Sequence, residues 1–148
     1  MSAPFAASIP EERFMSLIES CITAVVVSTV MGIALPPLNR ARQTYVLRST
    51  AGDVAGRMHF ARISAITRNR DCRLSVTSAT SYIIECDEGS WRTIERLAMP
   101  RGVTLSANAR PEFHRRGNVS PTATFTLRNM AGAVRRVIVN VNGRVRIQ

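Results

Sequence analysis

Residues 16–39 read SLIESCITAVVVSTVMGIALPPLN, and within them Glu19 is followed by twenty residues without a formal charge. Twenty residues of α-helix rise roughly 30 Å, which matches the hydrocarbon core of a bilayer. The run is too long for the apolar region of a secretory signal, and no A-x-A cleavage site ends it. It therefore predicts a retained membrane anchor with a carboxylate at its edge, where a charge is costly without a partner.

On either side of this run the composition changes. The parts we expect are a polar leader (1–14), the membrane half of a long N-terminal helix (15–39), an amphipathic half (40–69) and a β domain (70–148). The amphipathic half carries apolar residues at spacings of three and four, which predicts one buried helical stripe that stops near Asn69. The stripe consists of Leu47, Ala51, Val54, Met58, Ala61 and Ala65.

Beyond residue 70 the pattern changes to alternation and β-branched residues, which is typical of strands. Asn142-Gly143 predicts a hairpin between the last two strands, whereas residues 108–121 read as a long exposed loop. The expected fold is α+β, with a long N-terminal helix, membrane-spanning in its first half, packed on an antiparallel β-sheet. The candidate strands are 73–77, 82–85, 92–96, 103–106, 123–128, 134–141 and 144–147.

The charge is strongly positive, with 20 basic against 10 acidic residues. From Arg40 onward 19 arginines stand against seven acidic residues, a net charge of +12. A field of this sign favours polyanions such as nucleic acid or anionic lipid head groups. Every basic residue is arginine, and the bias of a high-GC genome is the alternative explanation for the missing lysines.

The cysteines are few, and two of them flank a possible hairpin. Cys72 and Cys86 would face each other if the segment between them turns near Ala79, and a disulfide there requires an oxidising compartment. Two free thiols are the alternative. Cys21 lies in the apolar run, where we expect a small apolar residue facing lipid or a helix.

No arrangement typical of an enzyme appears in the sequence. His59 and His114 are far apart and are expected at the surface, and no Cys/His/Asp cluster has metal-ligand spacing. No nucleophile–base pair, phosphate loop or carboxylate pair stands out. Trp91 is expected in the core. We therefore predict a non-enzymatic protein that needs no cofactor and no metal.

The N-terminal region resembles the type IV pilin superfamily. The resemblance rests on Ser16-Leu17-Ile18-Glu19, the apolar run, and Ala34-Leu35-Pro36. In pilins a glutamate is the fifth residue of the mature chain and a proline follows seventeen positions later, as Pro36 follows Glu19. Three further stretches resemble the FimT/GspH family of minor pilins and pseudopilins, namely residues 61–69, 113–117 and 137–146.

This resemblance implies a role in filament assembly for the N-terminal residues. The Glu19 carboxylate would pair with the N-terminal amine of a neighbouring subunit, and Pro36 would belong to the same assembly segment. Prepilin peptidase would cleave between Phe14 and Met15, where family members carry Gly and usually Phe. This departure, together with a preceding segment that is not net basic, argues against processing, and an unprocessed membrane-anchored form is the alternative.

The C-terminal hairpin carries the residues expected to bind nucleic acid. Arg144 and Arg146 stand at i and i+2, so on a strand they project from one face. The stretch Gly143–Arg146 resembles the G-R-x-R ending of DNA-binding FimT proteins, which implies contacts with the backbone of duplex DNA. The alternative is a solvated sheet face, and the hairpin register is open. Further arginines expected near this pair are Arg128, Arg135 and Arg136 on preceding strands. Arg115 and Arg116 in the loop would widen the same surface, and an exposed charge pair of the loop is the alternative.

The resemblance implies a minor pilin of a type IV pilus, placed near the tip and binding DNA during uptake. Its partners would be other pilins, prepilin peptidase, double-stranded DNA and inner-membrane lipid. The precursor would cross the inner membrane once, with the C-terminal domain in the periplasm. The alternatives are a GspH-like minor pseudopilin of a type II secretion system and a structural pilus subunit without DNA binding.

Overall fold

The structure, a computed structural model, describes residues 17–148 apart from the side chains of residues 33–37. The expected leader and the cleavage positions Phe14 and Met15 lie outside the described residues, as does the Pro36 side chain. The chain divides into two compact units after Leu38. Each unit is described by itself.

In the first unit, the described residues belong to helix α1 (Leu17–Thr67). Its large apolar side chains are exposed: Leu17, Ile18, Ile22, Val25, Val26, Val27, Val30 and Met31. The hydroxyls of Thr23, Ser28 and Thr29 each donate to the carbonyl four residues earlier, at 2.7–2.8 Å, so these polar groups are satisfied within the helix. Among the residues that the structure describes, no helix has a stretch apolar and long enough to span a bilayer.

In the second unit, the helix buries the predicted apolar stripe. All six stripe residues, from Leu47 to Ala65, are at most 2% exposed. The helix ends at Thr67. Asn69 adopts a left-handed conformation with φ 51°, and the Arg70 N–H donates to the Ala65 carbonyl at 3.0 Å. This is the Schellman arrangement that ends many helices, with asparagine in the position glycine usually takes.

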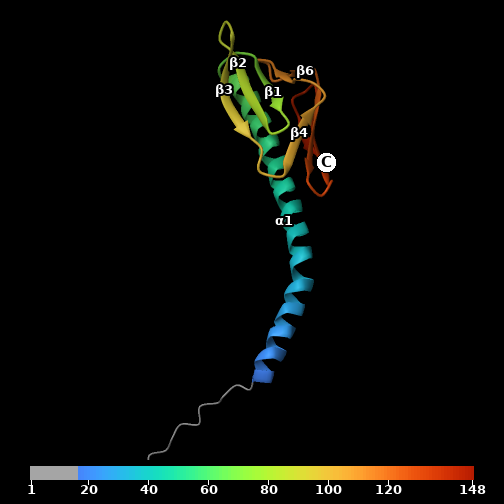
Figure 1. The fold of residues 1–148 in the computed structure, drawn as a ribbon. Helices are drawn as coiled ribbons and strands as arrows, with labels where there is room; N and C mark the ends of the chain where they lie inside the picture. Colours follow the sequence, from blue (N-terminus) through green and yellow to red (C-terminus); the bar gives the residue numbers. More distant parts are fainter. Residues whose placement is uncertain (1–16) are drawn as a thin grey trace, which may run out of the picture. The chain divides into compact units, whose positions relative to one another are not determined.

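Within residues 17–148 the chain also forms nine strands, paired antiparallel into two sheets (Figure 1). The first sheet has the order β3-β2-β1-β5-β6 and the second the order β4-β7-β8-β9. The strands are β1 (Cys72–Ser78), β2 (Ser81–Asp87), β3 (Trp91–Ala98), β4 (Val103–Ala107), β5 (Glu112–Phe113), β6 (Val119–Ser120), β7 (Ala123–Asn129), β8 (Val134–Val139) and β9 (Val145–Ile147).

The α+β fold and all seven predicted strands are confirmed, but one sheet was expected and two are present. The chain turns after β3, where the Val103 N–H donates to the Pro100 carbonyl at 3.2 Å, and β4 then pairs with β7. The prediction of an exposed loop over residues 108–121 is wrong. This segment forms β5 and β6, and Phe113 and Val119 within it are fully buried.

One core joins the helix stripe to the inner faces of both sheets, and its largest fully buried side chains include Met58, Leu74, Phe113 and Phe125. Trp91, expected in the core, is half-buried at the start of β3. The Arg73 guanidinium lies 4.0 Å from the centroid of its ring. Trp91 therefore acts as a cation–π partner at the edge of the first sheet.

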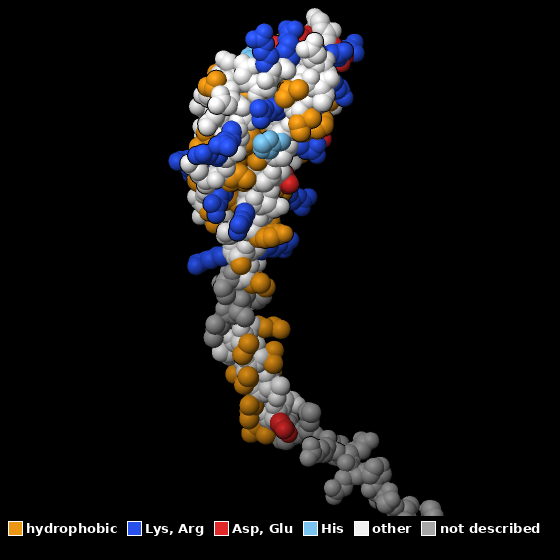
Figure 2. All heavy atoms as spheres, turned by 180° about the vertical axis from the view of Figure 1, so that it is seen from behind, with side chains coloured by type: hydrophobic (Ala, Val, Ile, Leu, Met, Phe, Trp, Pro, Cys, Tyr) orange, Lys and Arg blue, Asp and Glu red, His pale blue; other side chains and the backbone are white. Residues whose placement is uncertain are grey.

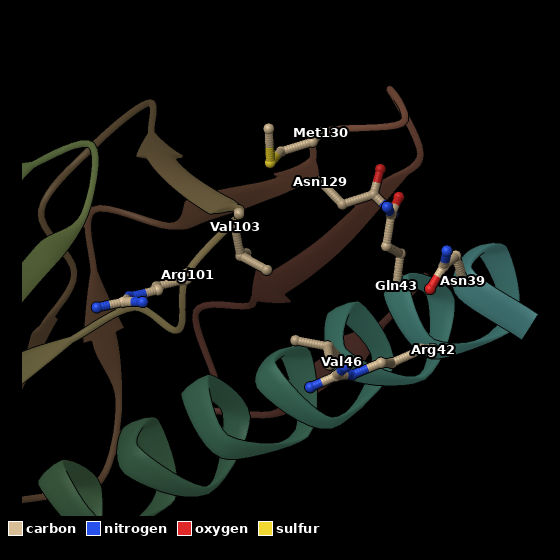
Figure 3. A pocket seen from close by; sticks show the side chains of 9 residues that line it. Asn39, Arg42, Gln43, Val46, Arg101, Val103, Asn129 and Met130 are labelled. Carbon is tan, nitrogen blue, oxygen red and sulfur yellow. The ribbon is translucent and has the colours of Figure 1, made fainter.

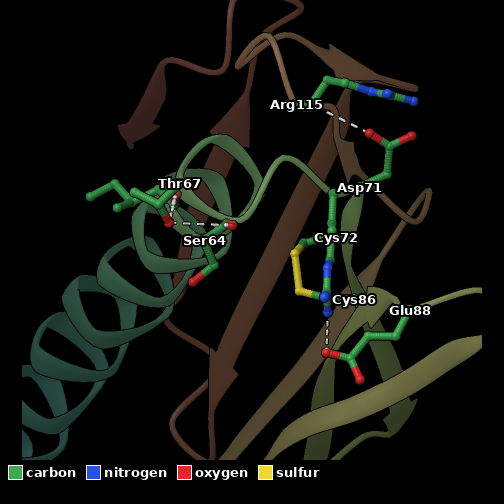
Figure 4. Close-up of a disulfide and its surroundings, with 9 residues drawn as sticks. Ser64, Thr67, Asp71, Cys72, Cys86, Glu88 and Arg115 are labelled. Atoms are coloured by element: carbon green, nitrogen blue, oxygen red, sulfur yellow. Dashed lines mark hydrogen bonds and ion pairs between the residues drawn. A yellow bond between two sulfur atoms is a disulfide. The ribbon is translucent and has the colours of Figure 1, made fainter.

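The first sheet contains a cross-strand disulfide. Cys72 on β1 lies directly opposite Cys86 on β2, and the two sulfurs are bonded (Figure 4). Beside them the Arg115 N–H donates to Asp71 Oδ1 at 3.1 Å, and Arg70 pairs with Glu88. Cys21 is a free, exposed thiol.

Candidate functional site

The register of the second sheet decides which arginines share a face. Arg146 on β9 is paired with Ile138 on β8, and the Asn140 N–H donates to the Arg144 carbonyl at 3.1 Å. Arg136 is paired with Gln148 through two hydrogen bonds of 2.8 Å. Directly opposed residues of antiparallel strands project to the same side, as do residues at i and i+2. Arg136, Arg144 and Arg146 therefore lie on one face.

A fourth arginine joins them from β7. Arg136 is opposite Thr126 and Val134 is opposite Arg128, so Arg128 projects to the same side as Arg136. All four arginines are exposed, whereas the alternate residues of these strands, such as Phe125 and Val137, are fully buried. We call the surface formed by Arg128, Arg136, Arg144 and Arg146 the arginine face.

Arg135 does not belong to this face, although the sequence analysis grouped it with Arg136. It is paired with Leu127 of β7, whose side chain is buried in the core, so it projects to the opposite side. Its side chain is half-buried. Neighbours in a strand always alternate sides, and the sequence left the register open.

The arginine face carries no acidic residue, and two apolar residues of β8, Val134 and Ile138, project to the same side. The other residues on this side of β4 and β7 are Thr104, Ser106, Thr124 and Thr126. Among the described residues, none of the four arginines lies within ion-pair distance of a carboxylate. From the Arg128 row to the Arg144 row the strands advance six residues, about 20 Å. Figure 2 shows many basic and few acidic side chains on one side of the molecule.

An arginine of the helix bonds to the turn between β5 and β6, and the hairpin that carries Arg144 lies close against both. Arg62 Nε donates to the Gly117 carbonyl at 2.9 Å. A Cβ on Gly143, whose φ is +70°, would lie 2.5 Å from the Gly117 carbonyl oxygen and 2.6 Å from Arg62 Nε. In the sequence, Arg62 lies outside the apolar stripe and has no other distinguishing feature. The glycines at both turns were the available signal for this close approach.

Arg62 and Arg144 also line a shared hollow at the end of the arginine face, together with His59, Asn140 and Asn142. The two guanidinium groups and the amide side chains provide donors for an anionic oxygen. His59 is exposed, as expected. The hollow extends the basic surface from the sheet to the helix.

Arg115 and Arg116 lie in the turn between β5 and β6, with exposed side chains. This turn contacts the hairpin, because the Val119 N–H donates to the Val141 carbonyl at 2.7 Å. The carboxylates of Asp71 and Glu112 lie beside this turn, whereas the arginine face has no carboxylate. Local charge there is therefore partly compensated, and these two arginines extend the basic surface less than their sequence suggests.

His114, expected to be an ordinary surface residue, lies half-buried between two carboxylates. Its Nδ1 is 3.3 Å from Asp71 Oδ2 and 3.8 Å from Glu112 Oε1. The three side chains each offer one ligand atom, all within 4.8 Å of one another. The sequence did not reveal this grouping, because Asp71 lies far from Glu112 and His114 in the chain.

Glu19 lies in the first turn of α1 with an exposed side chain. A carboxylate is favoured there by the helix dipole, whose N-terminal end carries partial positive charge.

Comparison with known proteins agrees with this architecture. The sequence profile of the family described as Type II transport protein GspH matches residues 50–143, more than half of the chain. The minor pseudopilin EpsH from the type 2 secretion system of Vibrio cholerae is similar in structure, with a TM-score of 0.61 and 13% identity over 69% of this chain and 95% of that one.

The type IV minor pilin FimU of Pseudomonas aeruginosa is also similar, with a TM-score of 0.59 and 18% identity over 76% of this chain and 92% of that one. A search of curated proteins finds no match. At these identities the structural likeness shows the fold, which minor pilins and pseudopilins share. The profile match shows the family: this chain belongs to the GspH family of type II transport proteins.

Proposed function

We propose that this protein is a FimT-like minor pilin that binds duplex DNA through the arginine face during DNA uptake. The observation that carries the proposal is the placement of four exposed arginines on one acid-free sheet face. Guanidinium groups bind phosphate oxygens in a planar, two-point manner, and they remain charged at any physiological pH.

The contacts would be with the DNA backbone and not with base edges. Among the described residues, no aromatic side chain lies on the arginine face, so stacking on unpaired bases is not provided. A sheet face with charged and hydroxyl side chains can contact successive phosphates along about 20 Å without reading sequence. Binding of this kind is non-specific and strongly salt-dependent.

The assembly part of the proposal places the protein in a filament near the pilus tip. Membership of the GspH family and the exposed apolar residues of α1 support packing against the helices of other pilins. Before assembly, the uncharged run after Glu19 would anchor the chain in the inner membrane, with the β domain in the periplasm. The Cys72–Cys86 disulfide fits an oxidising compartment. Pairing of Glu19 with a neighbour's amine belongs to the same proposal, and it would require cleavage between Phe14 and Met15, where the residues depart from those of the family.

The test is DNA binding by the full chain in a neutral detergent, measured between about 50 and 200 mM salt. With four phosphate contacts, affinity should fall roughly 100-fold over this range, because each contact adds about 0.9 to the slope of log affinity against log salt. The Arg144→Ala/Arg146→Ala variant should bind more weakly, and its slope should be shallower by about two contacts.

Arg135 and Arg136 provide a matched control, since they are adjacent in sequence and project from opposite sides of β8. Arg136→Ala should weaken binding and reduce the salt slope, whereas Arg135→Ala should leave the slope unchanged. Equal effects of the two substitutions would show that net charge, and not the arginine face, is responsible. No binding at low salt would remove the DNA proposal.

A GspH-like minor pseudopilin of a type II secretion system is the second candidate. The family profile and the fold of EpsH favour it. Deleting the gene separates the two candidates. Loss of a pilus subunit for DNA uptake would abolish transformation, whereas loss of a pseudopilin would abolish secretion of folded proteins. Loss of piliation alone would point to a structural pilus subunit.

A further inference from the structure

A second polar hollow lies at the opposite end of the β7–β8 hairpin from the arginine face's Arg144 (Figure 3). It is formed by the beginning of the amphipathic part of α1, the turn before β4 and the end of β7. Its volume, about 280 Å³, is below the roughly 300–1,000 Å³ of pockets that enclose small-molecule ligands. Its size suits a single side chain. The lining residues used below are Arg42, Val46, Arg101, Val103, Asn129 and Met130.

The wall of this hollow contains a buried donor without an acceptor. Asn129 is only 6% exposed, and its Nδ2 is the one buried side-chain nitrogen or oxygen without a hydrogen-bond partner in the described part of the chain. The orientation of the amide is fixed, because Oδ1 accepts the Ala133 N–H at 2.8 Å. A buried amide donor left unpaired is costly. The Gln43 side chain lines the same hollow, so the acceptor for Nδ2 is either the Gln43 amide oxygen after a rotation or a group that enters from outside the chain.

The charge around this donor defines the acceptor. Arg42 on the helix and Arg101 before β4 line the same hollow, and no acidic residue does. Among the described residues, neither arginine lies within ion-pair distance of a carboxylate. In Figure 3 the Arg101 guanidinium points away from Asn129. When both arginine side chains turn toward the hollow, their guanidinium groups and the amide N–H together suit an oxyanion, which accepts several charge-assisted hydrogen bonds at once.

We propose that this hollow receives an aspartate or glutamate side chain of a neighbouring pilin or pseudopilin subunit. Val46 and Val103 line the hollow beside its polar residues, and Met130 at its rim is 84% exposed. Methionine and arginine are enriched in protein interfaces, and both residue types line this hollow. The inference rests on the filament assembly proposed above, but it does not depend on DNA binding.

The test replaces Met130 by a photo-crosslinking amino acid in the full chain, in cells that make the other pilins. We expect a crosslink to one neighbouring subunit, mapped by mass spectrometry to a peptide with an acidic residue. Asn129→Asp keeps the oxygen that accepts the Ala133 N–H but replaces the donor by a negative oxygen. It should therefore lower the crosslink yield at least fivefold, and Arg101→Glu should do the same.

A charge-reversal pair identifies the contact. Changing the mapped acidic residue of the partner to arginine should lower the yield with the wild-type chain and restore it with Arg101→Glu. Arg136→Glu, on the arginine face, serves as the matched control and should leave the crosslink unchanged. Co-purification of the chain with other pilins is measured in parallel. If the wild-type chain does not co-purify with other pilins, filament assembly itself is contradicted.

Three outcomes would overturn the inference while leaving assembly intact. The chain could co-purify with pilins without any crosslink from position 130. The crosslink could form with phospholipid, which would assign the hollow to a lipid phosphate. It could also form with a pilin and be insensitive to both Asn129→Asp and Arg101→Glu, which would show proximity without carboxylate recognition.

Discussion

The two sheets use charge in opposite ways. In the first sheet, arginines pair with acids: Arg73 contacts Glu85 at 2.7 Å, and Arg57 of the helix contacts Glu95 at 2.9 Å. In the second sheet, the four arginines of the arginine face have no acidic partner among the described residues. Residues 103–107 and 123–148, which form the second sheet, contain five arginines and no acidic residue. The positive charge is thus concentrated where it is free to meet an external partner.

The substitutions with the largest expected effect test whether the two sheets unfold together or separately. Phe113 belongs to the first sheet and Phe125 to the second, and both are fully buried in one core. Phe113→Ala and Phe125→Ala should each lower the free energy of unfolding by about 3–5 kcal/mol. Chemical denaturation would measure both, and each should show a single transition. Separate transitions for the sheets would contradict a shared core.

Reduction of the disulfide tests whether the stability of the chain and its DNA binding depend on different sheets. The bond closes a short loop within the first sheet, with a sequence separation of 14, and a loop of this size contributes about 3 kcal/mol in the chain-entropy model. Reduction, or Cys72→Ala/Cys86→Ala, should lower the midpoint of unfolding. At temperatures where the chain stays folded, DNA affinity should not change, since the arginine face is on the other sheet.

A Cys21→Ser background removes the free thiol from this experiment. An equal loss of DNA binding in the folded, reduced protein would show that the sheets are coupled.

Tyr82 gives the first sheet a dependence on alkaline pH. Burial, aided by Glu95 and Asp53 and opposed by Arg57, raises the pKa of Tyr82 to about 12 from the ordinary 10.0. Because the folded chain holds this proton more tightly, its contribution to stability is complete below pH 10 and is lost as the pH rises to about 12. The loss should be roughly 3 kcal/mol. Denaturation at several pH values would measure it, and Tyr82→Phe should remove this part of the slope.

The smallest effect concerns the ion pairs themselves. The Arg57–Glu95 pair is partly exposed, and pairs of this kind contribute about 0.2–1 kcal/mol. Glu95→Gln should therefore lower the free energy of unfolding by less than 1 kcal/mol, and salt should reduce the difference. A larger loss would mean that paired charges are central to the first sheet, and the contrast between the sheets would become sharper.

The sequence predicted those parts of the fold that leave a periodic pattern. The stripe from Leu47 to Ala65 and the longer strands have such a pattern, and both are confirmed. Strands of two residues, such as Glu112–Phe113, are too short to show alternation. The division into two sheets depends on β4 pairing with β7 across a long separation, and local sequence does not encode that choice.

The candidate site was predicted in its residue types but not in its geometry. Arg144 and Arg146 were placed on one face from their spacing alone, whereas assigning Arg136 to that face and Arg135 to the other required the pairing of β7 with β8. Arg62 was missed as the residue that bonds to the β5–β6 turn beside the hairpin, because Gly117 and Gly143 are far from it in the chain.

The position of β9 at the edge of the second sheet has a consequence for solubility. An edge strand offers unpaired backbone groups to any other extended chain, and charged side chains are a common means of blocking such contacts. Arg144 directly precedes this short strand and Arg146 lies within it, so their charges also disfavour edge-to-edge aggregation. Replacing both by alanine uncovers a strand that contains Val145 and Ile147. Replacement by lysine would keep the edge guarded while removing the planar two-point contact with phosphate.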